Sequence, residues 1–200
     1  MQINLLEIPV VIASVDKPSY RQRQLKIISS LKQRGFKNIK VYNGPQYDPY
    51  PIAVAQTRLE IFQRYNSIPI TILEDDAVIS EAFKPVISIP NDAEILYLGA
   101  AYHKSSRTLS YADVPDYMVK RLFRTCGMHA TLFINKRAIR RYSKIMTVSV
   151  TKKIHPDKTL LTYLKRIKTY VPHQSFFYQP DKKEITDIDL SEIIDREVIQ

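Results

Sequence analysis

Three consecutive carboxylates, Glu74, Asp75 and Asp76, directly follow the apolar residues 68–73 in the stretch TILEDDAVI. Adjacent carboxylates repel one another unless they share a cation, and oxygen ligands suit Mg²⁺ or Mn²⁺. In open α/β sheets, ligands bind outside the carboxyl ends of the strands. The pattern therefore predicts a ligand site with a divalent cation at the end of a strand. The alternative is that Asp75 or Asp76 caps a following helix.

The elements that would position these acids alternate short β-branched runs with amphipathic stretches, which is typical of an α/β fold with a mostly parallel sheet. Strands are expected at residues 8–15, 39–42, 68–73, 93–98, 130–135 and 169–171. Helices are expected at residues 20–34, 53–65, 79–88, 136–146 and 156–165. In the first helix, Leu25, Ile28 and Leu31 keep helical spacing and form the expected apolar face, and Gly35 ends it. A chain of 200 residues is expected to form a single domain.

The chain is basic, with a formal charge of +10 and a pI near 9.6. A basic surface raises the local concentration of nucleotide sugars, nucleic acids and anionic lipids, although solubility alone is the alternative explanation. The basic residues gather at 17–40, 136–144 and 152–168, and Tyr20, Tyr142, Tyr163 and Tyr170 are interleaved with them. Such a surface could follow a phosphate backbone or an anionic glycolipid.

The sequence lacks the motifs that mark several common classes of functional site. There is no G-x-G-x-x-G or G-K-[ST] for a dinucleotide site or a P-loop, and no G-x-S-x-G for a hydrolase. The sequence HPDK at 155–158 lacks the helix pair of a J-domain, and the acids come too late in the chain for a receiver domain.

No apolar run approaches the roughly 18 residues that cross a bilayer, and the start lacks the cationic region of a signal peptide. The single cysteine, Cys126, excludes an internal disulfide. A cytoplasmic location is therefore expected.

The segments ITILEDDAV (70–78) and AVAQTRLEIFQRY (53–65) resemble the core of glycosyltransferase family 25, the lipooligosaccharide galactosyltransferase-like enzymes with a GT-A fold. The resemblance continues, in the family's order, in IPVVIASVDKPSYRQRQ (8–24), YLG (97–99), GMHATLFINKRAI (127–139), IHPDKTLLTYL (154–164) and YVPHQSFFYQPDKKEITDI (170–188). One departure is Thr57-Arg58, where the family usually has Ser-His. The resemblance implies a single GT-A-like (Rossmann-like) glycosyltransferase domain over residues 1–200, with a mostly parallel sheet flanked by helices.

The activity implied by the resemblance is that of a metal-dependent hexosyltransferase. It would move a sugar from a nucleoside diphosphate sugar, a UDP-sugar, to a hydroxyl of an anionic acceptor with inversion. Mn²⁺ or Mg²⁺ would stabilise the charge on the departing diphosphate as a Lewis acid. Asp76 would be the direct metal ligand, Asp75 would share the metal or support the ribose, and Glu74 would orient the loop.

Further contacts to the donor are expected from the end of the first strand and the turn after it. Ala13 and Ser14 would line the donor site. Arg21 and Arg23 could bind the diphosphate, because the guanidinium group matches phosphate geometry in a bidentate manner. Arg58 is a weaker candidate, since a solvated helix face explains it equally well.

Two histidines and one aspartate complete the set. His173 could supply another metal ligand or touch the phosphates, and His129 could reach the donor sugar; for both, a structural role is the alternative. Asp157 is the expected catalytic base, because a helix start favours its ionised form and a positioned carboxylate can accept the proton of the acceptor. A helix cap is the alternative role for Asp157.

The acceptor stays open between two classes. The resemblance favours a lipooligosaccharide-type glycan or glycolipid. Charge and compactness favour a hydroxymethylated base in DNA, which would have to be extruded from the duplex. Outside the enzymes, the alternative is a nucleic-acid-binding module without catalysis, in which Asp75 and Asp76 would be dispensable.

Overall fold

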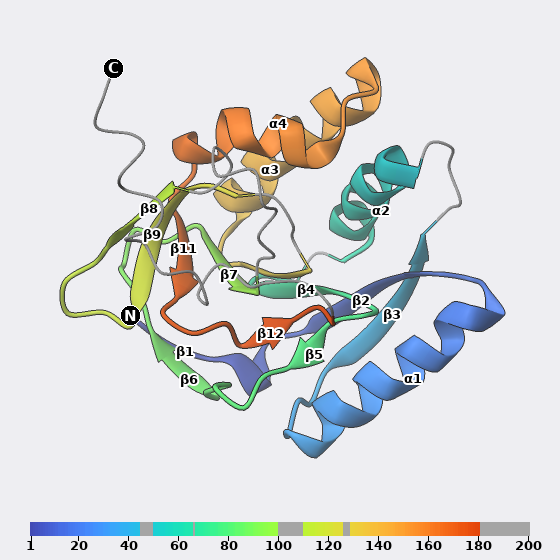
Figure 1. Ribbon diagram of the computed structural model, residues 1–200, viewed down its shortest axis with the longest axis horizontal. Helices are drawn as coiled ribbons and strands as arrows, with labels where there is room; N and C mark the ends of the chain where they lie inside the picture. The colour runs from blue at the N-terminus through green and yellow to red at the C-terminus, as the bar shows by residue number, and fades with distance from the viewer. Residues whose placement is uncertain (45–49, 66, 100–109, 126–128, 181–200) are drawn as a thin grey trace.

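The computed structural model describes residues 1–44, 50–65, 67–99, 110–125 and 129–180. Its centre is an eight-stranded sheet with the order β3-β2-β4-β10-β7-β11-β9-β8 (Figure 1). The strands of this sheet are β2 (Val10–Val15), β3 (Ile39–Gly44), β4 (Ile70–Glu74), β7 (Ile95–Gly99), β8 (Ser110–Asp113), β9 (Val119–Arg124), β10 (Ala130–Phe133) and β11 (Thr169–Pro172). The helices are α1 (Pro18–Gln33), α2 (Tyr50–Arg64), α3 (Lys136–Lys152) and α4 (Pro156–Tyr163), with the short 3-10 turns η1 (Leu5–Glu7) and η3 (Leu164–Arg166).

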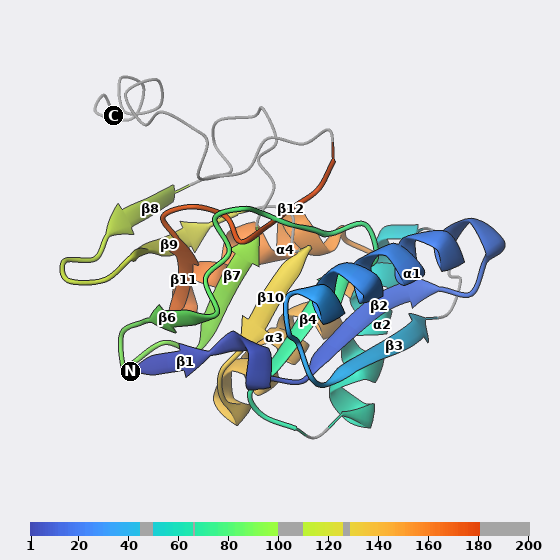
Figure 2. The same ribbon diagram turned by 90° about the horizontal axis from the view of Figure 1, so that it is seen from below.

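Two additional strand pairs lie outside the central sheet. The strand β1 (Gln2–Asn4) pairs with β6 (Val86–Ser88) (Figure 2), and β5 (Val78–Ile79) pairs with β12 (Phe177–Tyr178) (Figure 1). Cys126, Gly127 and residues 181–188 of the closing segment lie outside the described residues. Within the described part of the chain, no helix has both the length and the apolar character that a bilayer crossing requires.

The direction of the strands decides which residues meet at one edge. The strands β3, β2, β4, β7, β11 and β8 run in one direction, whereas β10 and β9 run against them. The central strands are buried on both faces, as the near-continuous burial of β4 and β7 shows. The expected α/β fold with a mostly parallel sheet and flanking helices is confirmed.

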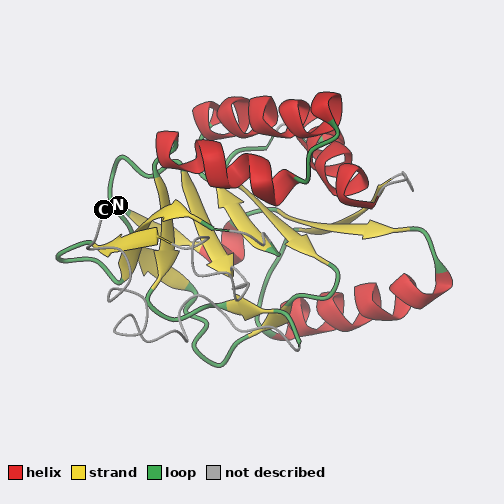
Figure 3. Cartoon of the chain, turned by 45° about the horizontal axis from the view of Figure 1, so that its top comes forward, coloured by secondary structure: helices red, strands yellow, loops and turns green. Residues whose placement is uncertain are grey.

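The helices that the structure describes lie on both faces of the sheet, three on one face and one on the other (Figure 3). On one face α2, α3 and α4 pack together, and Phe62, Phe133 and Tyr142 form an edge-to-face cluster with ring centroids 4.8–6.0 Å apart. On the other face α1 and the two short strand pairs cover a second apolar cluster, which includes Ile27 and Leu31. The sheet is therefore a buried middle layer, and only its edges are open to ligands.

The first helix spans Pro18–Gln33, within two residues of the expected range 20–34, but its buried face differs from the expectation. Pro18 occupies the first turn of α1, and Gly35 follows the helix with φ of +90°, a conformation that glycine adopts without strain. The expected apolar position Leu25 is wrong, because its side chain is 68% exposed. The residues that α1 buries are Ile27 and Leu31.

The largest error concerns residues 79–88, for which a helix was the expectation. The chain there forms β5 and β6, which pair with β12 and β1 respectively. The β-branched residues of both segments find strand partners that are distant in the sequence, and these pairings outweigh the local helical pattern. The helix α3 is also longer than expected and runs on to Lys152, and the strands β8 and β9 were not anticipated.

Substitutions in α1 test which of its faces is buried. We expect Ile27→Ala to lower the free energy of unfolding by about 2–5 kcal/mol, because it leaves a cavity in the core. Leu25→Ala should change that free energy by no more than about 0.5 kcal/mol, since the side chain is exposed. Urea denaturation of both variants measures the difference, and equal losses would contradict this orientation of α1.

Candidate functional site

The three acids lie at the carboxyl end of β4, in a tight turn. The parallel register of β2 with β4 places Ala13 opposite Glu74. The Glu74 backbone N–H donates to the His129 carbonyl (2.8 Å), and the Ala77 N–H donates to the Glu74 carbonyl (3.1 Å). The chain then enters β5, so no helix follows the acids. The alternative that Asp75 or Asp76 caps a helix is therefore wrong.

Asp75 is held by residues of β2 and α1. Its side chain is buried, and the Ser14 hydroxyl donates to its Oδ2. The Gln24 amide nitrogen in turn donates to Ser14 Oγ (2.8 Å) and to Asn43 Oδ1 (2.9 Å), which fixes the serine. A guanidinium nitrogen of Arg23 lies 4.0 Å from Asp75 Oδ1. This arrangement orients the carboxylate toward the end of the sheet.

The surroundings of Asp75 work against its charge. Burial raises the pKa of this carboxyl above its usual value, and the neighbouring carboxylates of Asp76 and Glu74 raise the pKa further. The Ser14 hydrogen bond and the Arg23 charge lower the pKa and offset only part of this effect. An added positive charge beside Asp75 would therefore be stabilising.

Glu74 and Asp76 share a donor that directly follows β12, the last strand among the described residues. The side-chain amide of Gln179 donates to Glu74 Oε2 (3.0 Å) and to Asp76 Oδ1 (2.8 Å). Glu74 also pairs through its Oε1 with Arg58 of α2 at 3.3 Å, and the Arg58 side chain is only 1% exposed. Gln179 was not among the expected site residues, although it lies in the segment 170–188 that carries the resemblance. Gln24 was missed as well.

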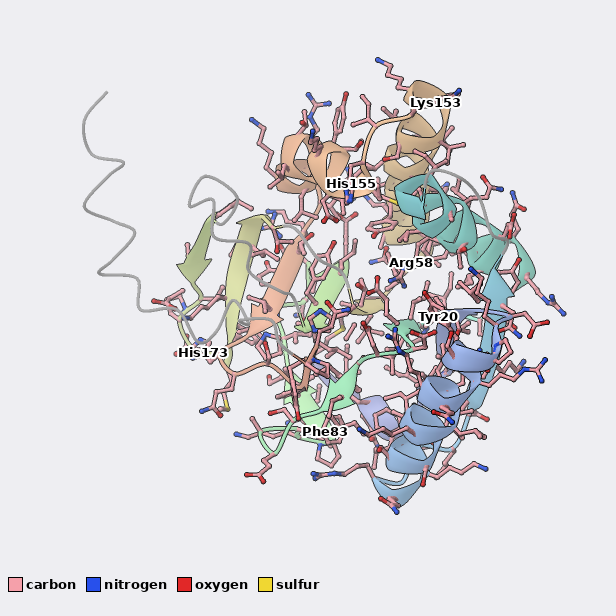
Figure 4. All side chains as sticks on the ribbon, turned by 45° about the vertical axis from the view of Figure 1, so that its right-hand side comes forward. Tyr20, Arg58, Phe83, Lys153, His155 and His173 are labelled. Carbon is pink, nitrogen blue, oxygen red and sulfur yellow. The ribbon has the colours of Figure 1, made fainter. Side chains whose placement is uncertain are left out.

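These side chains surround one hollow at the carboxyl ends of β2 and β4. Its lining comprises Ala13, Ser14 and Val15 of β2, Tyr20 and Arg23 of α1, Ala53, Val54, Thr57 and Arg58 of α2, and the three acids. Figure 4 shows the labelled Tyr20 and Arg58 on the two helices that flank it. The Arg23 guanidinium carbon lies 5.2 Å from the centre of the Tyr20 ring. A second hollow continues past Asp75 and Asp76 along α1 to Lys26.

The expected site residues divide into two groups. The structure brings Ala13, Ser14, Arg23, Arg58, Asp75 and Asp76 together around the first hollow. The other expected residues lie outside its lining. Arg21 pairs with Asp16 at 3.2 Å, with both side chains largely exposed. A simple surface role fits Arg21.

The two histidines lie apart from the hollow for different reasons. His129 is fully buried, and its Nε2 lies 3.3 Å from the Phe177 carbonyl oxygen. A Cβ at Gly99 would come within 2.4 Å of this same nitrogen, so glycine is needed where β7 ends. His173 is exposed beyond β11, which β10 and β7 separate from β4, and Figure 4 shows it far from Arg58 and Tyr20. The structure therefore does not join His173 to the acids, contrary to the expected metal ligand set.

Asp157 lies in the first turn of α4, near a buried pair of tyrosines. The helix cap is His155, whose Nδ1 accepts from the Asp157 backbone N–H (3.2 Å), so Asp157 is not needed as the cap. Burial raises the pKa of both Tyr97 and Tyr142. The Asp157 carboxylate raises the pKa of these two hydroxyls further, and the Arg58 charge lowers it. Asp157 and Arg58 thus act on the same two groups, although Asp157 does not line the first hollow.

The chemistry of the hollow combines negative and positive groups. Within the described residues, no three His, Cys, Asp or Glu side chains form a group that could hold a metal by themselves. Asp75 and Asp76 still fit a cation of the magnesium type, because such ions are commonly held by one or two carboxylates together with substrate phosphates and water. Arg23 and Arg58 lie in the same lining and suit a phosphate-bearing ligand.

Comparisons with known proteins give a likeness of fold. No family model matches the chain, and no curated protein matches its sequence. Among solved structures, the chain is similar to a glycosyltransferase involved in the glycosylation of the major capsid of PBCV-1, with a TM-score of 0.55 and 11% identity over 88% of this chain and 95% of that one. It is also similar to A197 from STIV (TM-score 0.47, 14% identity, 92% and 95% covered) and to a UDP-glucose pyrophosphorylase complexed with UDP-glucose (0.47, 11%, 94% and 78%). The first of these supports the Rossmann-like GT-A fold, and the resemblance to family 25 itself stays a prediction.

Titration of Asp75 offers a test of this geometry. Folding raises the pKa of the Asp75 carboxyl, so its ionisation begins to lower stability as the pH rises above the unfolded value of 3.8. The loss is complete once the pH exceeds the raised pKa, and below 3.8 the carboxyl has no such effect. We therefore expect Asp75→Asn to be more stable than the wild type at pH 7, with a difference that shrinks as the pH falls toward 3.8. Thermal unfolding across this pH range measures the difference. A variant that is less stable at pH 7 and equal in acid would contradict the assigned surroundings.

Proposed function

We propose that the protein is a glycosyltransferase that takes a sugar from a nucleoside diphosphate donor, with the donor bound in the hollow at the carboxyl ends of β2 and β4. The observation that carries the proposal is the gathering of three carboxylates and two arginines around this hollow. The likeness of the fold to that of a capsid glycosyltransferase supports it. In sheets of this kind, the carboxyl end of the strands is where nucleotides bind.

The two arginines have different parts in donor binding. The Arg23 side chain is 53% exposed and lies against Tyr20, so it can swing onto the diphosphate when the donor enters. Arg58 is fixed beneath the hollow by its pair with Glu74 and contributes positive charge from a buried position. Ala13 and Ser14 form the strand-end wall, where the small Ala13 side chain leaves room for the nucleoside. UDP is the proposed nucleotide.

The acids fit a divalent cation at the rim of the same hollow. Asp76 would be its direct ligand and Asp75 would share it. Glu74 already forms an ion pair with Arg58 and accepts a hydrogen bond from Gln179. A bound Mn²⁺ or Mg²⁺ supplies a Lewis acid for the charge that builds on the departing diphosphate. Gln179 holds the Asp76 carboxylate in place through its amide hydrogen bond. This makes Gln179 a positioning residue.

Transfer to the acceptor requires a base, for which we propose Asp157. Its carboxylate takes the proton of an acceptor hydroxyl while the hydroxyl oxygen bonds to the anomeric carbon and the bond from that carbon to the diphosphate oxygen breaks. A single displacement of this kind inverts the anomeric centre and needs no nucleophilic side chain. The acceptor is an anionic molecule, either a glycan or glycolipid or a hydroxymethylated base of DNA.

The isosteric change Asp76→Asn tests the proposal. The asparagine still accepts from Gln179 but lacks the charge that a cation requires, so donor-dependent activity should fall about a hundredfold or more, since Lewis-acid stabilisation amounts to several kcal/mol. The assay is hydrolysis of a UDP-sugar with Mn²⁺, in which water takes the sugar in place of the acceptor and the nucleoside diphosphate is released. Thermal shift with UDP-sugars and other nucleotide sugars, with and without Mn²⁺, measures binding.

Glu81→Gln is the matched control, because it removes the same charge at an exposed residue outside the hollow. It should match the wild type in both assays. Full activity of Asp76→Asn, or a wild type that no nucleotide sugar stabilises in the presence of Mn²⁺, would refute the donor site.

A further inference from the structure

A second charged feature lies on the helical face of the sheet, away from the donor hollow. The sequence of α3, KRAIRRYSKIMTVSVTK, contains no Asp or Glu. Basic residues on its outer side are exposed, and so are those of η3, which lies beside α3 across a shallow groove. We name Lys136, Arg137, Arg140, Lys144, Lys165 and Arg166 the α3 basic surface.

Little negative charge offsets this surface. Grooves flank α3 toward α2 and toward η3, and neither lining contains a carboxylate. A third hollow, beside Arg137, Lys165 and Arg166, contains Asp92 and Glu94, and Asp92 pairs with Lys168 (3.4 Å). The buried Glu94 pairs with Arg137 (3.0 Å) and Arg141 (2.9 Å) and is thereby used. For Lys136, Arg140, Lys144 and Lys165, no carboxylate of the described residues lies within ion-pair distance. At these four residues the surface therefore carries positive charge that no carboxylate of the described residues compensates.

We propose that the α3 basic surface docks double-stranded nucleic acid through its phosphate backbone. One helical turn advances about 5.4 Å, so Arg137, Arg140 and Lys144 present cations in a row along α3. Duplex DNA carries one phosphate charge per roughly 1.7 Å of its axis, so such a row meets phosphates in any register. The tyrosine of this helix, Tyr142, is fully buried and cannot stack on bases. Contact limited to phosphates makes the docking independent of sequence.

A membrane surface fits the same residues less well. A helix that binds a bilayer inserts an apolar face between the head groups. The apolar face of α3, with Ile145 and Met146, is buried in the core against the sheet and α2. Exposed large apolar side chains such as Leu25 and Met118 lie elsewhere, and Ile154, which follows the far end of α3, is a single residue and is only 37% exposed. The α3 basic surface thus offers charge without an apolar wedge, which suits a polyanion in water.

The position of the surface separates it from donor chemistry. Because α3 follows β10, which runs antiparallel to β4, its first turns lie at the sheet edge opposite the acids. The docking would keep an acceptor carried by the nucleic acid at high local concentration without touching the donor hollow. The inference therefore goes beyond the proposed function, and each can fail without the other.

Neutral substitutions on two faces test the docking. The variant R140Q/K144Q/K165Q removes three cations from the surface, and K32Q/R34Q/K84Q removes three exposed cations elsewhere. Both lose the same net charge. Fluorescence anisotropy with a labelled DNA duplex of about 20 base pairs, between about 50 and 200 mM salt, gives the affinity and its salt slope. We expect the first variant to bind at least tenfold more weakly with a log–log slope smaller by about 3, and the control to stay near the wild type.

Three outcomes would overturn the proposal. They are equal losses in the two variants, no duplex binding by the wild type at low salt, and binding only to vesicles of anionic phospholipid. An unchanged unfolding temperature shows that each variant is folded. Release of nucleoside diphosphate from the donor, measured without nucleic acid, should be the same in the wild type and both variants, and this separates failure of the docking from failure of the donor site.

Discussion

The concentration of negative charge at the carboxyl end of β4 is the constraint on which the site depends. Three carboxylates on consecutive residues must be held apart and compensated in a partly buried place. The fold meets this need from separate directions: Ser14 and Arg23 act on Asp75, Arg58 acts on Glu74, and Gln179 joins Glu74 to Asp76. The same contacts tie β2, α1, α2 and the end of β12 to a single strand end.

The acids themselves could be found from the sequence, because residue type and the preceding apolar run identify them. Most of their partners could not. Gln179 is 103 residues from Asp76, and only the pairing of β12 with β5 brings it near. Gln24 sits on α1 without any local feature that distinguishes it from Gln22 or Gln33. The parallel register of β2 with β4, which sets Ser14 beside Asp75, is likewise a property of the assembled sheet.

The fold was predictable where one signal dominated. Buried runs such as residues 70–74 and helices with clear ends, such as α1, agree with the expectations. Errors arose where tertiary pairing decides the outcome. Residues 79–88 carry a weak helical pattern that two distant strand partners override. His173 was expected near the acids because it also follows the end of a strand. In the sheet, however, β10 and β7 lie between β11 and β4, and this order of strands cannot be inferred from the sequence.

The lining of the first hollow draws on residues 13–76 alone, and later parts of the chain reach its acids through Gln179 and the His129 carbonyl. The side chains around the proposed donor site therefore come from the first 76 residues of the chain. Under the proposed function, substitutions at exposed positions after residue 76 can change the acceptor contacts without replacing any residue of that lining. Such a division would let acceptor choice evolve separately from donor binding, provided that the Gln179 amide, which holds Glu74 and Asp76, is kept.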